Sequence, residues 1–304
     1  MKTLIIKGEG SSFERYFKAQ MRREDIDVES VRNPHNKLDI LLYYIVQYLK
    51  LTSLYGFWLK GWKKNIKIYD NIIVFDNGLS PVLLKWLHRN NKRANIKVWL
   101  WNIDNDYDIE FYKKYSQVYC FDKKFTQKNN ISFIDQFYIP QKSKNADNIQ
   151  KGVFYVGSDK KRYSLLKKIA QDLNKYNINH YFYLRRWPGE KYDENDADVI
   201  LSNEIMPYED VIKDIHKYEC VLELNLKEQE GFTLRTLEAL FYKRKLITNN
   251  KNVRNYKFYN KNDFYILGDE DRSIKEFMDM SFKEIDDSLL EDYTYDHWLN
   301  KILS

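Results

Sequence analysis

Short apolar runs alternate along the chain with longer stretches in which apolar residues recur every three or four positions. Runs of about four to eight apolar residues are typical of strands buried on both faces, whereas the longer pattern is typical of helices. This alternation predicts an α/β protein with parallel sheets covered by helices. In the first half, the predicted strands are Thr3–Ile6, Asn71–Asp76, Ile96–Trp101, Gln117–Asp122 and Phe133–Ile139, and the predicted helices are Lys37–Lys60, Pro81–Arg89 and Asp108–Tyr115.

A polar segment without periodicity, Pro140–Gly152, interrupts the pattern and predicts an interdomain connection. A second alternating series follows it, with predicted strands Gly152–Ser158, Asn179–Leu184, Asp198–Ser202, Glu219–Leu226, Lys245–Asn250 and Phe264–Leu267, and predicted helices Tyr163–Tyr176, Tyr208–Tyr218 and one from near Thr233. We therefore expect a Rossmann-like domain at 1–140, a linker at 141–152, a second Rossmann-like domain at 153–273 and helices at 274–304. Ligands of open sheets bind beyond the carboxyl ends of the strands, so we expect the site in a cleft between two facing sheets.

The composition indicates a folded, contact-rich chain. Its 304 residues suffice for two domains, 43% of them are hydrophobic, and 25 are tyrosines. Cys120 and Cys220 lie in apolar runs and lack the companions of a disulfide or zinc site. The first residues lack the long apolar core of a secretory signal, so we expect a cytoplasmic protein.

The apolar and aromatic segment Tyr43–Trp62 allows two interpretations. Polar residues such as Gln47 and Lys50 interrupt residues 41–59 too early for a membrane-spanning helix. The segment is either an interfacial surface that approaches a lipid-linked acceptor at the inner face of the cell membrane, or a buried helix of the first domain. Core packing is the more common fate of such a segment.

The net charge of +6 is scattered along the chain, which suits phosphate-bearing ligands, an anionic membrane surface or nucleic acid. A nucleic-acid-binding module is therefore one alternative. Such modules concentrate their positive charge, whereas here 50 basic residues are interspersed with 44 acidic ones. We expect no nucleic-acid partner.

The segment Glu230–Glu238, EGFTLRTLE, carries the most informative chemistry of the chain. Thr233 is a suitable N-cap for a helix beginning at Leu234. The helical period then separates a buried stripe from a flank that carries Arg235, Glu238 and Tyr242. The stripe consists of Leu234, Leu237, Leu240 and Phe241.

This flank suits a nucleotide-sugar. The N–H groups of Gly231–Thr233, the helix dipole and the charge of Arg235 would attract a diphosphate. Glu238 would hold the ribose, and Glu230 would reach the transferred sugar. The alternative is that two glutamates at this spacing arise by chance in so charged a chain.

Four segments resemble GT-B glycosyltransferases, in particular bacterial proteins of lipopolysaccharide or capsular-polysaccharide biosynthesis. QEGFTLRTLEALFYKRKLITNN, starting at Gln229, resembles their donor-binding signature, and VFYVGSDKKR, starting at Val153, resembles the first strand and phosphate turn of their donor domain. In the first half, VWLWN and VYCFDKKF resemble their tryptophan-Asn and Phe-Asp segments. The resemblance covers about the middle two-thirds of the chain.

The resemblance implies a GT-B fold, with Rossmann-like domains facing across a cleft, and a donor site in the second domain. By that resemblance Glu230 and Glu238 form the paired-glutamate motif around Arg235. Gly157, Lys160 and Arg162 fall in the phosphate turn, which departs from the pattern because Lys161 stands where a glycine precedes the arginine. Solvated surface charge is the alternative interpretation of Lys160 and Arg162.

Other residues are weaker candidates. Tyr208, after Pro207, would stack on a nucleobase or else pack in the core. Arg185 and Arg186 end a predicted strand and would reach phosphate there.

An inverting transfer needs a base in the first domain, whereas a retaining one does not. The candidates stand at predicted strand ends or in loops: Glu9, His35, Asp76 and Asp104. For each of them, a role as an ordinary turn or cap residue is the more common outcome.

Together these patterns predict an enzyme that moves a hexose-type sugar from a nucleoside diphosphate, with UDP the expected carrier, to an oligosaccharide or a lipid-linked acceptor. We expect no cofactor and no required metal, because no Asp-x-Asp ends a predicted strand of the first domain and cationic side chains can replace the ion. A sugar-nucleotide epimerase with two Rossmann-like domains is the alternative enzyme.

Overall fold

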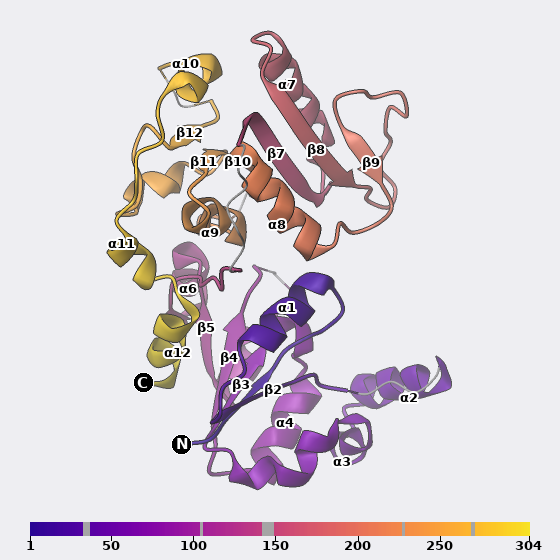
Figure 1. The fold of residues 1–304 in the computed structure, drawn as a ribbon. Helices are drawn as coiled ribbons and strands as arrows, with labels where there is room; N and C mark the ends of the chain where they lie inside the picture. Colours follow the sequence, from indigo (N-terminus) through magenta and orange to yellow (C-terminus); the bar gives the residue numbers. More distant parts are fainter. Residues whose placement is uncertain (33–36, 104–105, 142–148, 227–228, 269–270) are drawn as a thin grey trace. The chain divides into compact units, whose positions relative to one another are not determined.

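The computed structural model describes residues 1–304 except 33–36, 104–105, 142–148, 227–228 and 269–270 (Figure 1). The chain divides into unit 1, residues 1–135 and 298–304, and unit 2, residues 136–297. Each unit contains a six-stranded sheet in which neighbouring strands run parallel. The predicted pair of Rossmann-like sheets is therefore confirmed.

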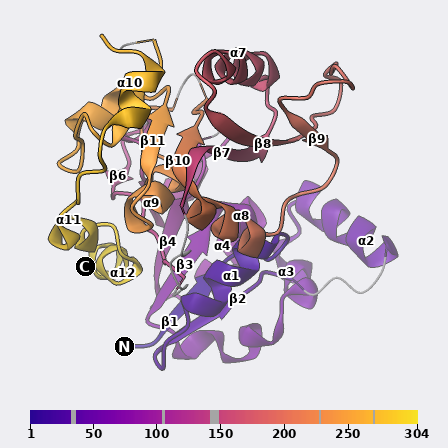
Figure 2. The ribbon, with the colours of Figure 1, turned by 45° about the horizontal axis from the view of Figure 1, so that its top comes forward.

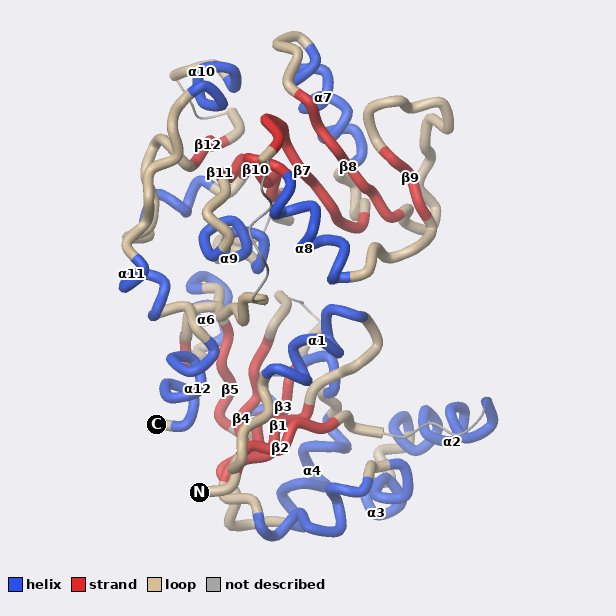
Figure 3. Tube along the Cα trace, in the orientation of Figure 1, coloured by secondary structure: helices blue, strands red, loops and turns tan. Residues whose placement is uncertain are grey.

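Unit 1 has its strands in the order β2-β1-β3-β4-β5-β6, which is a flavodoxin-like order extended by one strand. The helices alternate with the strands along the chain, as Figure 3 shows by colour. The elements are β1 (Thr3–Ile6), α1 (Ser12–Gln20), β2 (Ile26–Glu29), α2 (Lys37–Tyr48), α3 (Thr52–Tyr55), η1 (Gly56–Trp58), η2 (Gly61–Ile68), β3 (Asn71–Phe75), η3 (Asp76–Gly78), α4 (Pro81–Asn90), β4 (Asn95–Leu100), α5 (Ile109–Lys113), β5 (Gln117–Cys120), α6 (Lys123–Asn129) and β6 (Ser132–Phe133).

Unit 2 has the order β12-β11-β10-β7-β8-β9. Read from β9 to β12, with β7 as the first strand, this is the Rossmann order 3-2-1-4-5-6. Figure 2 shows its central strands side by side. The elements are β7 (Gln150–Ser158), α7 (Tyr163–Asn174), β8 (Asn179–Arg185), β9 (Ile200–Ser202), α8 (Tyr208–Lys217), β10 (Tyr218–Glu223), α9 (Leu234–Phe241), β11 (Lys245–Thr248), η4 (Lys251–Asn255), β12 (Phe264–Ile266), α10 (Ile274–Asp279), α11 (Asp287–Glu291) and α12 (Tyr295–Leu303), whose last residues belong to unit 1.

The end of the chain completes the core of unit 1. Trp298 is 1% exposed, and its ring centroid lies 5.4 Å from that of Trp99 and 5.8 Å from that of Phe75. The ammonium group of the buried Lys97 donates a hydrogen bond to the carbonyl of Ile302. Residues 298–304 are thus part of the first unit, whereas the sequence analysis treated 274–304 as one separate segment.

The boundary between the units also differs from the predicted one, at 135/136 instead of 140. Tyr138 is fully buried within unit 2, and its N–H donates to the carbonyl of Tyr293 at 2.8 Å. Its hydroxyl hydrogen-bonds to those of Tyr208 and Tyr242 at 2.8 and 3.0 Å. These contacts end the predicted strand Phe133–Ile139 early, so that β6 is only Ser132–Phe133.

The predicted helix Lys37–Lys60 is wrong as a single element, because α2 ends at Tyr48 and short helical turns follow. Lys50 has a φ of 53°, in the left-handed region, which terminates an α-helix. The sequence analysis also missed α1, β2 and α6. Within the described parts of the chain, no helix combines the length and apolar character needed to cross a bilayer.

We expect Trp298→Ala to lower the free energy of unfolding of unit 1 by about 3–5 kcal/mol, because it leaves a cavity between Trp99 and Phe75. Chemical denaturation followed by intrinsic fluorescence measures the change. Lys301→Ala, at an exposed position of the same helix, serves as the control. Equal stabilities of the two variants would contradict the assignment of the chain end to the core of unit 1.

Candidate functional site

The sheet of unit 2 reverses its strand order between β7 and β10, which are adjacent and parallel. Beyond the carboxyl end of β7 the chain turns into α7, and beyond that of β10 it continues to α9. Open α/β sheets bind ligands at such a switch point. The phosphate turn and the segment Glu230–Glu238, predicted from the sequence as the donor site, follow these two strands and therefore meet at one edge of the sheet.

The carboxylate of Glu223, the last residue of β10, holds the start of α9 in place. It is 2% exposed, and its Oε1 accepts hydrogen bonds from the hydroxyls of Thr233 and Thr236 at 2.5 and 2.7 Å. The N–H of Thr233 also donates to Oε1, at 3.2 Å, and the hydroxyl of Thr248 donates to Oε2 at 2.6 Å. One buried charge thus connects β10, β11 and α9.

The predicted N-cap of this helix is confirmed, because the Thr233 hydroxyl accepts a hydrogen bond from the N–H of Arg235 at 3.0 Å. Before the cap, side-chain amides hold the backbone oxygens of the turn. Asn225 donates to the carbonyl of Gly231 at 3.1 Å, and Asn250 donates to that of Glu230 at the same distance. The Glu230 side chain is half-buried, and its contact with a transferred sugar stays a prediction.

Glu238 lies in the interior, although the helical period predicted it on a flank beside the buried stripe. Its contact with a ribose stays a prediction. The residue is 2% exposed; its Oε1 accepts from the Tyr208 hydroxyl at 2.9 Å, and its Oε2 lies 2.5 Å from the guanidinium of Arg235. Burial raises the pKa of Glu238, whereas Arg235 and Tyr208 act to lower it. In this arrangement the carboxylate positions Arg235.

Buried tyrosines extend this network. The Tyr208 hydroxyl contacts that of Tyr138, which donates to the hydroxyl of Tyr242. The predicted flank of Arg235, Glu238 and Tyr242 therefore does share one network, in which Glu238 and Tyr242 are buried and the side chain of Arg235 is 18% exposed. Tyr208 itself is 4% exposed, so of the two alternatives for this residue the structure supports the core-packing one.

In the phosphate turn, Asp159 occupies the start of α7. Its Oδ1 accepts from the N–H groups of Arg162 and Tyr163, both at 2.7 Å, and its Oδ2 accepts from the Tyr192 hydroxyl at 2.8 Å. Because this carboxylate already binds two N–H groups at the helix start, a ligand phosphate would depend more on side chains of the turn. Gly157 is required by crowding, since a Cβ there would lie 2.6 Å from the Tyr155 hydroxyl.

Arg162 in the phosphate turn and Arg235 in α9 both act electrostatically on the hydroxyl of Tyr155. Tyr155, in β7, is 3% exposed, and burial raises its pKa, while the charges of Arg162 and Arg235 both act to lower it. Two arginines that lie 73 positions apart in the sequence thus both act on the charge of this tyrosine. Lys160 makes a different contact from the two arginines: its ammonium lies 5.8 Å from the ring centroid of Trp187.

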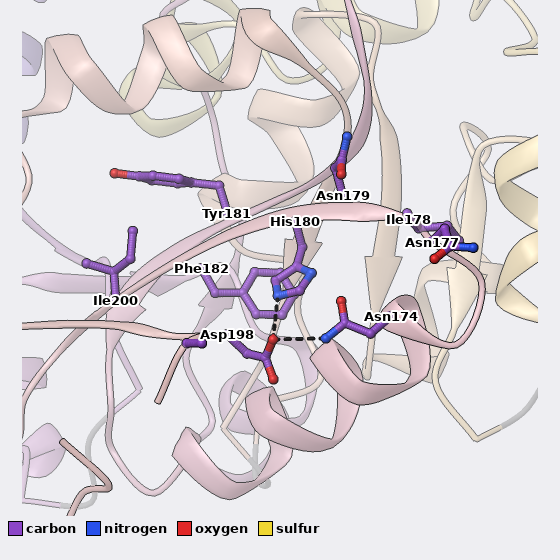
Figure 4. A pocket seen from close by; sticks show the side chains of 10 residues that line it. Asn174, Asn177, Ile178, Asn179, His180, Tyr181, Phe182, Asp198 and Ile200 are labelled. Atoms are coloured by element: carbon purple, nitrogen blue, oxygen red, sulfur yellow. Dashed lines mark hydrogen bonds and ion pairs between the residues drawn. The ribbon is translucent and has the colours of Figure 1, made fainter. Parts of the chain in front are cut away.

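A cavity of about 680 Å³ lies at the carboxyl ends of β8 and β9, lined by Arg185, Arg186, Trp187 and Tyr192 among others. Arg186 forms two hydrogen bonds with Glu194, at 2.8 and 2.5 Å, which raise the pKa of the arginine. Arg185 lines the cavity, and its contact with phosphate stays a prediction. A second cavity, of about 360 Å³, lies at the amino ends of the same strands around His180 and Asp198, at the opposite edge from the switch point (Figure 4).

In unit 1 the switch point lies between β1 and β3, and two base candidates follow these strands. Glu9 pairs with Lys18 and Lys60 at 2.7 and 2.6 Å, and these contacts lower its pKa to about 2. Asp76 accepts hydrogen bonds through Oδ2 from the N–H and side-chain amide of Asn102 and from the Tyr107 hydroxyl. A carboxylate with so low a pKa is a weak base, which counts against Glu9.

His35 and Asp104 lie outside the described residues. Among the described residues, no group of three or more histidine, cysteine, aspartate and glutamate side chains converges as a metal site would require.

Sequence reasoning missed a buried lysine at the switch point of unit 1. Lys7 is 1% exposed, and its ammonium lies 4.6 Å from the ring centroid of Trp101 and 4.8 Å from that of Phe75. Burial lowers the pKa of Lys7 to about 8, although Glu14 and Asp76 act to raise it.

Sequence reasoning also missed Glu223, Asp159 and Tyr155. A charged residue directly at the end of an apolar strand is the signal that Lys7, Glu223 and Asp159 share.

We expect Glu238→Ala to lower the free energy of unfolding by about 3 kcal/mol, because it leaves Arg235 and the buried Tyr208 hydroxyl without the carboxylate. Denaturant titration measures this. The exposed Glu284 provides the matched control, and Glu284→Ala should change stability by less than about 0.5 kcal/mol. A Glu238→Ala variant as stable as the control would mean that the carboxylate does not hold the network together.

Lys160 and Lys161 have φ values of 41° and 68°, in the region that favours glycine. We expect Lys161→Gly to raise the free energy of unfolding by about 0.5–1 kcal/mol, because it relieves left-handed strain at an exposed position. Lys168→Gly, at an exposed position within α7, should instead lower it by about 1 kcal/mol. Thermal melts of the two variants check the signs, and destabilisation by Lys161→Gly would contradict the turn geometry.

Comparison with known proteins shows the fold of the whole chain. No protein-family description matches its sequence, and no curated protein sequence does. Among solved structures it is similar to an alpha-glucosyltransferase (AGT) in complex with UDP, with a TM-score of 0.59, 11% identity and 100% of both chains covered. It is also similar to an alpha,alpha-trehalose-phosphate synthase (UDP-forming) from Burkholderia vietnamiensis, with a TM-score of 0.58, 8% identity and coverage of 100% and 99%. An alpha-glucosyltransferase in complex with UDP-glucose and DNA containing an abasic site matches with a TM-score of 0.54, 11% identity and coverage of 99% and 92%. With its two successive parallel six-stranded sheets, the chain has the GT-B fold.

Proposed function

We propose that this protein is a glycosyltransferase that takes a hexose-type sugar from a nucleoside diphosphate, with UDP the preferred carrier. The observation that carries the proposal is that Arg162 and Arg235 lie in the segments that follow β7 and β10, the two adjacent strands at the switch point of unit 2, and that the charges of both act on Tyr155. Two guanidinium groups on one edge of a Rossmann-like sheet suit the two phosphates of such a donor. Two of the similar structures contain UDP or UDP-glucose, which agrees with this choice of donor.

In this reaction a hydroxyl of the acceptor attacks the anomeric carbon as the bond to the diphosphate breaks. Negative charge then grows on the leaving phosphate, and Arg162 and Arg235 stabilise it more in the transition state than in the ground state. Glu238 is the positioning residue for Arg235, because its buried carboxylate holds the guanidinium from the interior side. We further propose that Glu230 binds the transferred sugar and that the reaction needs no metal ion, since these cationic groups supply the charge.

For an inverting reaction the proposed base is Asp76. Tyr107 and Asn102 orient its carboxylate by hydrogen bonds of 2.8–2.9 Å. The buried ammonium of Lys7 interacts electrostatically with the same carboxylate.

We propose an oligosaccharide or lipid-linked acceptor, as in the assembly of bacterial surface polysaccharide. The resemblance of the segments around Gln229 and Val153 to enzymes of that assembly supports this choice. DNA is a second candidate acceptor, because one similar structure is an alpha-glucosyltransferase in complex with UDP-glucose and DNA. An acceptor panel with both classes, assayed with one radiolabelled UDP-sugar, distinguishes them by the product that gains label.

Donor binding is tested by thermal melts with UDP, GDP, CDP and ADP. A ligand that binds only the folded protein stabilises it by about 2.7 kcal/mol at 100 times its Kd. We expect UDP to give the largest increase in Tm. Arg162→Met should weaken UDP binding by about 10- to 100-fold, as expected for loss of a charge-assisted hydrogen bond.

Arg93→Met, at an exposed arginine of unit 1, is the matched control and should bind UDP as the wild type does. Absence of any increase in Tm with a nucleoside diphosphate would overturn the proposed donor. Interconversion of the UDP-sugar without an acceptor would instead support the epimerase alternative. Unchanged UDP affinity of Arg162→Met would remove Arg162 from the site.

A further inference from the structure

Helix α2 of unit 1 carries large apolar side chains on almost all sides, yet most of them are exposed. The exposed set includes Leu38, Leu41, Leu42, Tyr44, Ile45 and Tyr48. Leu41 is 56% exposed, Ile45 is 42% exposed and Tyr48 is 86% exposed. A helix that is apolar all round is normally buried, and a contiguous exposed apolar surface marks an interaction site. For the part of Tyr43–Trp62 that lies in α2, the interpretation as a buried helix holds only for Tyr43 and Val46, whereas Tyr44, Ile45 and Tyr48 are exposed.

Polar and aromatic contacts on one side attach α2 to the rest of unit 1. The Tyr43 hydroxyl lies 3.0 Å from that of Tyr55, and the indole N–H of Trp58 donates to Asp39 at 2.5 Å. The guanidinium of Arg32 lies 4.5 Å from the ring centroid of Tyr43. These contacts fix the side of α2 that faces the rest of unit 1, and the apolar side chains on its other sides stay exposed. Figures 1 and 2 both show α2 projecting from unit 1.

The charge around this helix selects among possible occupants. Residues 37–68 contain six lysines and a single acidic residue, Asp39. Lys50, directly after α2, is exposed, and so are Lys64 and Lys67 in η2. A second copy of the chain would bring two such basic segments together. Nucleic acid would pair with the lysines but would leave the leucine and isoleucine side chains in contact with water.

An anionic bilayer satisfies both features. Apolar side chains of an interfacial helix enter the boundary between headgroups and acyl chains, while nearby lysines bind anionic headgroups. Exposed aromatic side chains such as Tyr48 and Phe57 suit the same depth. With 12 residues, α2 is too short to span the bilayer. Lying in the plane of the interface is the mode of binding that its length allows.

We propose that α2 is an interfacial helix that docks unit 1 on an anionic lipid surface. This inference does not depend on the sugar-transfer reaction, because it rests on a surface of unit 1 alone and its test needs no substrate. If the transferase proposal also holds, the same contact would bring a lipid-linked acceptor to the enzyme.

Flotation of the full chain with vesicles tests the proposal. The vesicles contain phosphatidylglycerol and phosphatidylcholine in equal amounts, or phosphatidylcholine alone. We expect the wild type to float with the anionic vesicles and to bind neutral ones more weakly. The triple variant Leu41→Ser, Ile45→Ser, Tyr48→Ser should reduce partitioning by about tenfold or more. All three side chains are exposed, so its Tm should stay close to that of the wild type.

The matched control is Leu165→Ser, Tyr176→Ser, which removes two exposed apolar side chains from unit 2 and should float as the wild type does. A wild type that stays in the soluble fraction with anionic vesicles would overturn the proposal. Light scattering that reports a dimer, lost only in the triple variant, would overturn it in favour of a second copy. Salt-sensitive binding of duplex DNA that requires α2 would overturn it in favour of nucleic acid.

Discussion

The buried carboxylate of Glu223 is the contact on which the arrangement at the carboxyl edge of the unit 2 sheet depends. It receives four hydrogen bonds, three from the first residues of α9 and one from β11. A buried charge without partners would be strongly destabilising, so the helix start and the two strands have to meet at this point. The position of Arg235, two residues after Thr233, follows from that constraint.

Buried carboxylates inside unit 2 also determine which positively charged and N–H groups remain available to a ligand. Asp159 accepts hydrogen bonds from two N–H groups at the start of α7, and Glu238 holds Arg235 from the interior side. In the proposed donor site, an anion would therefore depend on the arginine side chains more than on these N–H groups. Guanidinium groups that are positioned before the ligand arrives lose less conformational freedom on binding, which favours the transition state of a phosphate leaving group.

Unit 1 combines a well-packed sheet with an apolar helix that the sheet does not use. The rings of Trp298, Trp99 and Phe75 close the core at the end of the chain. Helix α2 contributes only a few buried side chains, among them Tyr43 and Val46, to this unit. The stability of unit 1 and the chemistry of its surface thus depend on separate elements, which allows the two to be altered independently.

The sequence by itself determined the number of sheets, most of their strands and the N-cap at Thr233, because apolar periodicity and capping are local properties. It also selected the segments that follow β7 and β10. Only the tertiary structure decided that Glu238 and Tyr208 are buried, that α2 is exposed and that residues 298–304 return to unit 1. Burial depends on which distant side chains pack against a residue, as Trp99 does on Trp298 and Tyr138 on Tyr208. The left-handed conformation of Lys50 and Lys161 was equally hidden, because a residue with a Cβ rarely adopts it.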